Sequence, residues 1–172
     1  GFNNIDTVLN ILNTKYYHFE YTTVAMVDDY FGIATFTKYP IVNKGKIVFN
    51  TRSNNICIYT DVLIEKDTVR IYNMHLQSIS FSKKDHKFVG DLQDEDDAQD
   101  ELENSKSILR RLKRAFVKRA EQAEMVSASI KNCRYKIILC GDFNDTPASY
   151  AYNLISEDLK DAFIEKGNGF GR

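Results

Sequence analysis

The sequence predicts an α+β fold in which one β-sheet packs against another and helices cover the outside. The main observation is a pair of strand patterns: residues 55–65 alternate between two faces, and residues 69–76 return after a short turn at 66–68. Two strands joined this closely predict an antiparallel hairpin. Apolar residues occupy both faces of the first strand, which predicts burial from both sides, by a second sheet and by helices.

A long helical pattern and a short apolar run are the other two observations. The run at residues 137–140 is too short for a typical helix and rich in β-branched residues, which favours a buried strand. Residues 106–133 show helical periodicity. Their apolar stripe consists of Ile108, Leu109, Leu112, Phe116, Ala120, Ala123 and Val126.

The first fifty residues predict a helix followed by three strands. Apolar residues recur at helical spacing over residues 4–17, whereas residues 16–26 are aromatic and β-branched and predict a strand. A second strand is expected over 31–42, ending at Pro40, where the missing N–H favours a sheet edge or a strand end. Residues 44–51 predict a third strand.

Residues 78–104 are expected to form an acidic surface insertion. Eight of the thirteen residues from 91 to 103 are acidic, and few apolar residues anchor the segment, which predicts a solvated loop. The following helix has a basic face formed by Lys106, Arg110, Arg111, Lys113, Arg114, Lys118 and Arg119. This face either follows a polyanion or is a solvated surface that pairs with the acidic insertion. Because no aromatic residue is interleaved on it, the solvated interpretation is favoured.

Length, charge and cysteine content restrict the class of protein. A chain of 172 residues predicts a single domain over residues 1–172, and a net charge of −1 gives no global attraction to nucleic acid or to acidic membranes. The three cysteines lack CxxC spacing, which argues against a disulfide framework or a zinc knuckle. Cys57 and Cys140 fall in predicted strands and are expected to be small buried apolar residues. The sequence contains no transmembrane run.

The stretch from Tyr135 to Ser149 carries the candidate chemistry. If the strand continues to Asn144, the side chains of Asp142 and Asn144 point the same way and Phe143 points into the core. A carboxylate can hold a divalent cation or orient a water, and an amide nitrogen can donate to a phosphoryl oxygen. The simpler alternative is an Asx-type turn after a core strand.

Short elements are expected on the C-terminal side of this stretch. Thr146 and Pro147 are typical of a helix N-cap and a first helical position, which predicts a short helix over 147–156. Residues 159–163 predict a strand or a loop. His75, at the end of the returning hairpin strand, is either structural or an imidazole that binds a phosphate oxygen.

Three segments together resemble the endonuclease/exonuclease/phosphatase superfamily, the fold of deoxyribonuclease I. They are the strand that ends in NMHLQS, the helix that ends in RAEQAEMV, and ILCGDFNDTPAS. The segments FGIATFTKYPI and DLKDAF look like further strands of the family, so the similarity extends from Phe31 to Phe163. The resemblance implies a two-sheet β-sandwich flanked by helices, a four-layer α/β/β/α arrangement that agrees with the doubly buried hairpin.

The resemblance also implies roles for individual residues. Asp142 would orient or deprotonate the attacking water, Asn144 would contact the scissile phosphate or the metal, and His75 would contact the phosphate and stabilise its charge. Asp142 and Asn144 would thus be metal ligands, and Phe143 would belong to the core. Family members use Mg²⁺ or a similar hard cation, with Mn²⁺ as the alternative, which suits oxygen ligands.

Two motifs of the family pattern do not occur in this sequence. These are a Gln-Glu strand end before Phe31, whose Glu binds the metal, and an Asp-His pair after Phe163. His18 and His86 lie in the wrong context to replace the missing histidine. We therefore expect the fold to be incomplete at both ends. We also expect the 172-residue segment alone to be inactive and prone to association, because unpaired sheet edges would be exposed.

The leading functional hypothesis is a metal-dependent phosphoesterase that hydrolyses a phosphodiester or phosphomonoester by in-line water attack. Its partner would be a phosphate-ester substrate: nucleic acid, a phosphorylated small molecule or a lipid. The alternative is a non-catalytic binding or scaffold protein with the same fold. A nucleic-acid-binding module built on the basic helix is a third hypothesis, and it predicts salt-dependent binding through Arg110, Arg111 and Arg114.

Overall fold

The computed structural model describes residues 3–26, 29–49, 53–79 and 98–167. In chain order the elements are α1 (Asn3–Leu12), β1 (Tyr16–Met26), β2 (Asp29–Thr37), β3 (Ile41–Ile47), β4 (Ile56–Ile64), β5 (Asp67–His75), α3 (Ala98–Lys131), β6 (Lys136–Asp142), α4 (Tyr150–Ser156) and α5 (Ala162–Lys166). None of the described helices is long and apolar enough to cross a membrane.

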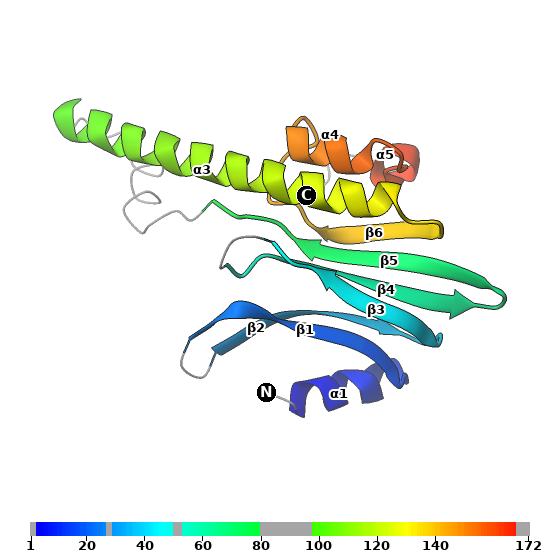
Figure 1. Cartoon of the computed structure of the whole chain (residues 1–172). Helices are drawn as coiled ribbons and strands as arrows, with labels where there is room; N and C mark the ends of the chain where they lie inside the picture. The colour runs from blue at the N-terminus through cyan, green and yellow to red at the C-terminus, as the bar shows by residue number, and fades with distance from the viewer. Residues whose placement is uncertain (1–2, 27–28, 50–52, 80–97, 168–172) are drawn as a thin grey trace.

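The elements form four layers, as Figure 1 shows. β1 and β2 make a two-stranded antiparallel sheet, and β3, β4, β5 and β6 make a four-stranded sheet in that order. Helix α1 lies outside the smaller sheet, and α3, α4 and α5 lie outside the larger one (Figure 1). The predicted α+β class, with two packed sheets and flanking helices, is confirmed.

The predicted hairpin of β4 and β5 lies at the centre of the larger sheet. Its strands pair without interruption from Ile56 opposite His75 to Ile64 opposite Asp67. β6 then pairs with β5 in the parallel direction, which places the carboxyl ends of both strands at the same edge of the sheet. β6 is also the last strand of this sheet.

The main hydrophobic core lies between the larger sheet and α3. Tyr72, Met74 and Leu76 from the end of β5 pack against Ala123 and Val126 of α3 in a single buried cluster. Because these three residues alternate with Asn73 and His75, burial of one face of the strand fixes the direction of the other face. The side chains of Asn73 and His75 therefore point toward the smaller sheet.

Polar contacts join the two sheets on their inner faces. The side-chain amide of Asn73 donates to the carbonyl of Ala34 on β2 at 3.0 Å. His18 of β1 is buried, and its Nδ1 lies 2.9 Å from the hydroxyl of Thr60 on β4. Burial, and after it the charge of Lys44, lowers the pKa of His18 below its ordinary value. His18 is thus a packing residue between the sheets.

Helix α3 departs from the prediction in its length and its exposure. It begins at Ala98, eight residues before the predicted start, and its first half extends beyond the sheet (Figure 1). Leu109 and Phe116, predicted members of the buried stripe, are therefore 64% and 49% exposed. Residues 80–97, the larger part of the predicted acidic insertion, lie outside the described part of the chain together with His86, so the insertion stays a prediction.

Several short elements also differ from their predictions. The predicted strand 31–42 is divided: β2 ends at Thr37, and β3 begins at Ile41, after Pro40. Helix α4 is capped by Ser149, whose hydroxyl accepts from the backbone N–H of Tyr152, so the prediction of Thr146 as N-cap is wrong. Of the segment predicted as a strand or a loop, residues 159–161 form a loop, whereas α5 begins at Ala162 because Asp161 caps the N–H groups of the first helical turn. Cys57 is buried as expected, whereas Cys140 is exposed on the edge strand.

Candidate functional site

The two predicted segments of the site meet where β5 and β6 end. In the parallel register, His75 stands opposite Asp142, and the N–H of Leu76 donates to the carbonyl of Asp142 at 2.9 Å. Neighbouring strands lie about 4.8 Å apart, so the two side chains start from adjacent points on one rim. This placement comes from the sheet register and requires no loop to fold back.

Gly141 allows β6 to approach β5 immediately before Asp142. Its φ is +148°, and a Cβ at this position would lie 2.1 Å from the carbonyl oxygen of Met74. No residue with a side chain fits at that separation without movement of the backbone. The glycine of the GDFN sequence therefore sets the close strand contact that positions the carboxylate beside His75.

The chain turns directly after Asp142. Asn144 has a φ of +51°, and its backbone N–H donates to Oδ1 of Asp142 at 2.8 Å, which is an Asx-type turn. The expectation that strand geometry persists through Asn144 is wrong, since β6 ends at Asp142. Phe143 packs against the core, with its ring 5.5 Å from that of Tyr152, as predicted. The Asx-type turn, given above as the simpler alternative, is therefore present, and it does not exclude the convergence of polar side chains at this position.

The Asn144 amide connects the turn to the end of β5. Its Nδ2 lies 3.1 Å from Nε2 of His75 and 3.0 Å from the carbonyl oxygen of Leu76. A carbonyl oxygen only accepts, so the amide group facing Leu76 is the NH₂, which fixes the orientation of the amide. The same NH₂ donates to His75, so Nε2 is the accepting nitrogen. Nδ1 then carries the imidazole proton and lies 3.4 Å from the carbonyl oxygen of Asn54.

This arrangement leaves oxygen atoms facing outward at the rim. Both hydrogens of the Asn144 amide are donated inward, and no hydrogen bond to its Oδ1 is found among the described residues. Asp142 is exposed, and only its Oδ1 is used in the Asx turn. Within the described ranges, no group of three or more His, Cys, Asp or Glu residues has the arrangement of a metal site. Two hard oxygen donors are nevertheless close together here.

A cavity of about 300 Å³ lies beside His75, between the smaller sheet and the start of β4. Its walls include Phe31 and Asn54, and Thr22 donates a hydrogen bond of 3.0 Å to the Asn54 side chain. The lining combines an aromatic ring with polar atoms next to the imidazole. Such a cavity suits an organic group attached to a phosphate that is held at the rim.

A buried arginine underlies both segments of the site. Arg119 of α3 is only 1% exposed; its Nε donates to Oδ2 of Asp145 at 2.8 Å, and its Nη1 donates to the carbonyl of Gln77 at 2.8 Å. Asp145 follows Asn144 directly, and Gln77 lies two residues after His75. One guanidinium group thus ties the segments that follow His75 and Asn144 to the same helix.

Gln122 reinforces this connection one turn later. Its Oε1 accepts from the backbone N–H of Gln77 at 2.9 Å, whereas its buried Nε2 has no hydrogen-bond partner among the described residues.

The prediction that Arg119 belongs to a solvated basic face is wrong. The signal that could have located it is its spacing, four residues after Ala115 and four before Ala123, both of which are buried.

Comparison with known proteins gives one family match and several similar structures. The model of the Endonuclease/Exonuclease/phosphatase family matches residues 2–172. Among curated proteins, none matches the sequence. The human Nocturnin catalytic domain, solved with a bound sulfate anion, is 15% identical with a TM-score of 0.51, and the match covers 90% of this chain and 52% of that one.

Two further solved structures are similar at lower TM-scores. Sphingomyelinase C from Streptomyces griseocarneus is 22% identical with a TM-score of 0.45, and the match covers 73% of this chain and 37% of that one. ANGEL2, a 2′,3′-cyclic phosphatase solved with adenosine-2′,3′-vanadate, is 16% identical with a TM-score of 0.47, and the match covers 89% and 39%. The chain thus spans about half or less of the length of these three solved structures.

Proposed function

The chain belongs to the endonuclease/exonuclease/phosphatase family, and on this premise we propose that the protein hydrolyses a phosphoester bond by in-line attack of water. The observation that carries the proposal is the convergence of His75, Asp142 and Asn144 on one rim, with the Asn144 amide hydrogen-bonded to the imidazole. In this arrangement the Asp142 carboxylate can serve as a base and the Asn144 amide oxygen as a ligand. The His75 imidazole can orient the Asn144 amide.

The hydrogen bonds favour particular roles for the three residues. Asp142 is exposed and can accept a proton from water or fix its orientation. Asn144 donates both amide hydrogens inward, so its Oδ1 acts as an acceptor or ligand, in preference to donating to the phosphate. His75 accepts from Asn144 and so holds that oxygen in place. For His75 Nε2 to contact the substrate phosphate, as proposed, its hydrogen bond from Asn144 has to break.

A hard divalent cation fits the oxygen pair of Asp142 and Asn144. Mg²⁺ is typically bound by one or two protein carboxylates together with waters and substrate phosphates, so two protein oxygens suffice to begin such a site. We propose Mg²⁺ as the resident ion, with Mn²⁺ as the alternative. When bound, the ion would supply charge stabilisation for the phosphoryl oxygens. Asp142 would carry the negative charge that retains it.

Removal of divalent cations tests this proposal. We expect the complete protein to hydrolyse bis(4-nitrophenyl) phosphate or 4-nitrophenyl phosphate, to lose this activity in EDTA, and to regain it when excess Mg²⁺ or Mn²⁺ is added. The measurement is release of 4-nitrophenolate, with Ca²⁺ addition as the comparison. Turnover that is indifferent to chelation would contradict the metal dependence. Phosphate-analogue binding without turnover in any metal would favour the scaffold alternative.

A further inference from the structure

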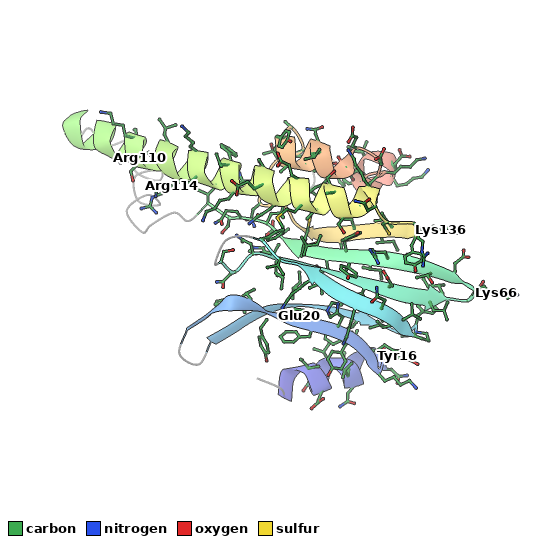
Figure 2. All side chains as sticks on the ribbon, viewed as in Figure 1. Tyr16, Glu20, Lys66, Arg110, Arg114 and Lys136 are labelled. Atoms are coloured by element: carbon green, nitrogen blue, oxygen red, sulfur yellow. The ribbon has the colours of Figure 1, made fainter. Side chains whose placement is uncertain are left out.

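A row of cationic side chains on α3 faces the loop that follows His75. Arg111, Arg114 and Lys118 line a cavity of about 170 Å³ whose opposite wall is formed by Gln77 and Ser78. Figure 2 shows Arg114 extending from the first half of α3, on the side of the helix that faces the sheet. The residues recur at intervals of three and four, so they lie on one face of the helix. Three positive charges therefore border a single small cavity.

The cavity lies close to the rim that carries the proposed chemistry. Ser78 is three residues after His75, and an extended chain spans at most about 3.6 Å per residue, so their Cα atoms are separated by no more than about 11 Å. The loop that forms one wall of the cavity thus begins at the rim, and a substrate that extends from His75 along this loop leads toward Arg114 and Lys118. The upper bound of about 11 Å exceeds the Debye length of about 8 Å at physiological salt, so the cations have to contact a substrate phosphate directly in order to bind it.

The loop that forms the cavity wall is held in place. The backbone N–H of Gln77 donates to Gln122 and its carbonyl accepts from Arg119, while its side-chain Oε1 accepts from Asn55 at 2.8 Å. Arg119 and Gln122 belong to the same helix as the cationic row. Direct hydrogen bonds therefore fix the Gln77 loop against the helix that carries the cationic row.

We propose that the row formed by Arg111, Arg114 and Lys118 binds a second phosphate group of the substrate, beside the scissile one. The proposal rests on the proposed phosphoesterase function and narrows its substrate class to molecules with at least two phosphates. The cavity is bordered by cations and by the backbone of Gln77 and Ser78, so the group that it suits is anionic and compact.

A pair of substrates that differ by one phosphate tests the proposal. Thymidine 5′-(4-nitrophenyl) phosphate carries only the scissile group, and its 3′-phosphorylated form carries a second. We expect the second phosphate to lower KM and expect the variant Arg114→Ala/Lys118→Ala to abolish this advantage, raising KM for the two-phosphate substrate on the order of fivefold. KM for the one-phosphate substrate should be unchanged. The advantage should also diminish as salt is raised.

The matched control is Lys113→Ala, which removes one positive charge from the opposite side of the same helix. It should leave both KM values unchanged. Equal effects of the Arg114→Ala/Lys118→Ala variant on both substrates, or an effect of Lys113→Ala as large as that of the double variant, would overturn the proposal.

Binding measurements separate failure of this proposal from failure of the proposed function. By calorimetry, the complete protein should bind thymidine 3′,5′-bisphosphate more tightly than thymidine 5′-monophosphate, and the double variant should bind both equally. This readout does not require turnover. The same comparison with inositol 1-phosphate and inositol 1,4-bisphosphate shows whether the nucleoside contributes. If the wild-type protein binds each mono- and bisphosphate pair equally, the second-phosphate site does not exist, whatever the catalytic result.

Discussion

Replacement of Asp142 by asparagine should lower kcat/KM of the complete protein by about 10²- to 10⁴-fold while the fold stays intact. Asparagine keeps an oxygen that accepts from the backbone N–H of Asn144, so the Asx turn that ends β6 is preserved. What is lost is the negative charge at the exposed rim. The substitution thus separates the proposed role of the carboxylate in proton transfer and metal retention from its role in the turn.

The control for this variant is Asp158→Asn, an exposed carboxylate in the loop after α4. It should leave both activity and stability unchanged, because no described hydrogen bond depends on its charge. Thermal unfolding measured alongside the kinetics shows whether the Asp142 variant remains folded. An Asp142→Asn protein with wild-type kcat/KM would remove the carboxylate from the mechanism.

Replacement of Arg119 by alanine should destabilise the protein by about 3 to 5 kcal/mol, the typical cost of breaking a buried ion pair by removing one partner. Asp145 is only 8% exposed and would keep its charge without its guanidinium partner. The Gln77 carbonyl would lose its hydrogen bond in the same substitution. Urea titration of the variant and the wild type gives the difference in the free energy of unfolding.

Further variants show how much of the stability at Arg119 comes from its charge and how much from its two hydrogen bonds. Arg119→Lys keeps a positive charge, but one ammonium group does not reproduce the forked contact to Asp145 and Gln77, so stability should be restored only in part. Arg119→Ala/Asp145→Ala should be more stable than Arg119→Ala alone, because no uncompensated carboxylate remains. Arg110→Ala on the exposed side should change stability by less than about 0.5 kcal/mol. Equal stabilities of Arg119→Ala and Arg110→Ala would contradict the buried contact.

Regular strand patterns in the sequence predicted the part of the fold that carries the site. Period-2 alternation located β4 and β5 and their antiparallel pairing, and the apolar run at 137–140 located β6. The β4 prediction succeeded because burial on both faces leaves a clear pattern in that strand. For β6 the strand was predicted correctly but its burial was not, since Ile138 is 53% exposed and Cys140 is exposed on this edge strand. The approach of His75 to Asp142 follows from the parallel register of β5 and β6, which the sequence analysis did not predict.

The structure differs from the sequence predictions where a local hydrogen bond decides the conformation, because such a bond leaves no repeating pattern in the sequence. The turn at Asn144 depends on one backbone N–H that finds the Asp142 carboxylate, and strand alternation contains no information about it. Thr146 and Ser149 are equally acceptable N-caps by residue type, and the structure uses Ser149. Arg119 was assigned to a solvated face because no aromatic residue is interleaved on that face, whereas in the structure it is buried and Asp145 compensates its charge.

The central claim is that His75 and Asn144 act as one unit, since the imidazole accepts the hydrogen bond that orients the amide oxygen. A double-mutant cycle of His75→Ala and Asn144→Ala, measured as kcat/KM of the complete protein at saturating Mg²⁺, tests it most directly. Each single variant should lose on the order of 10²-fold, and the double variant should lose much less than the product of the two single losses. Losses that multiply in the double variant would show that the two side chains act independently and would contradict the account.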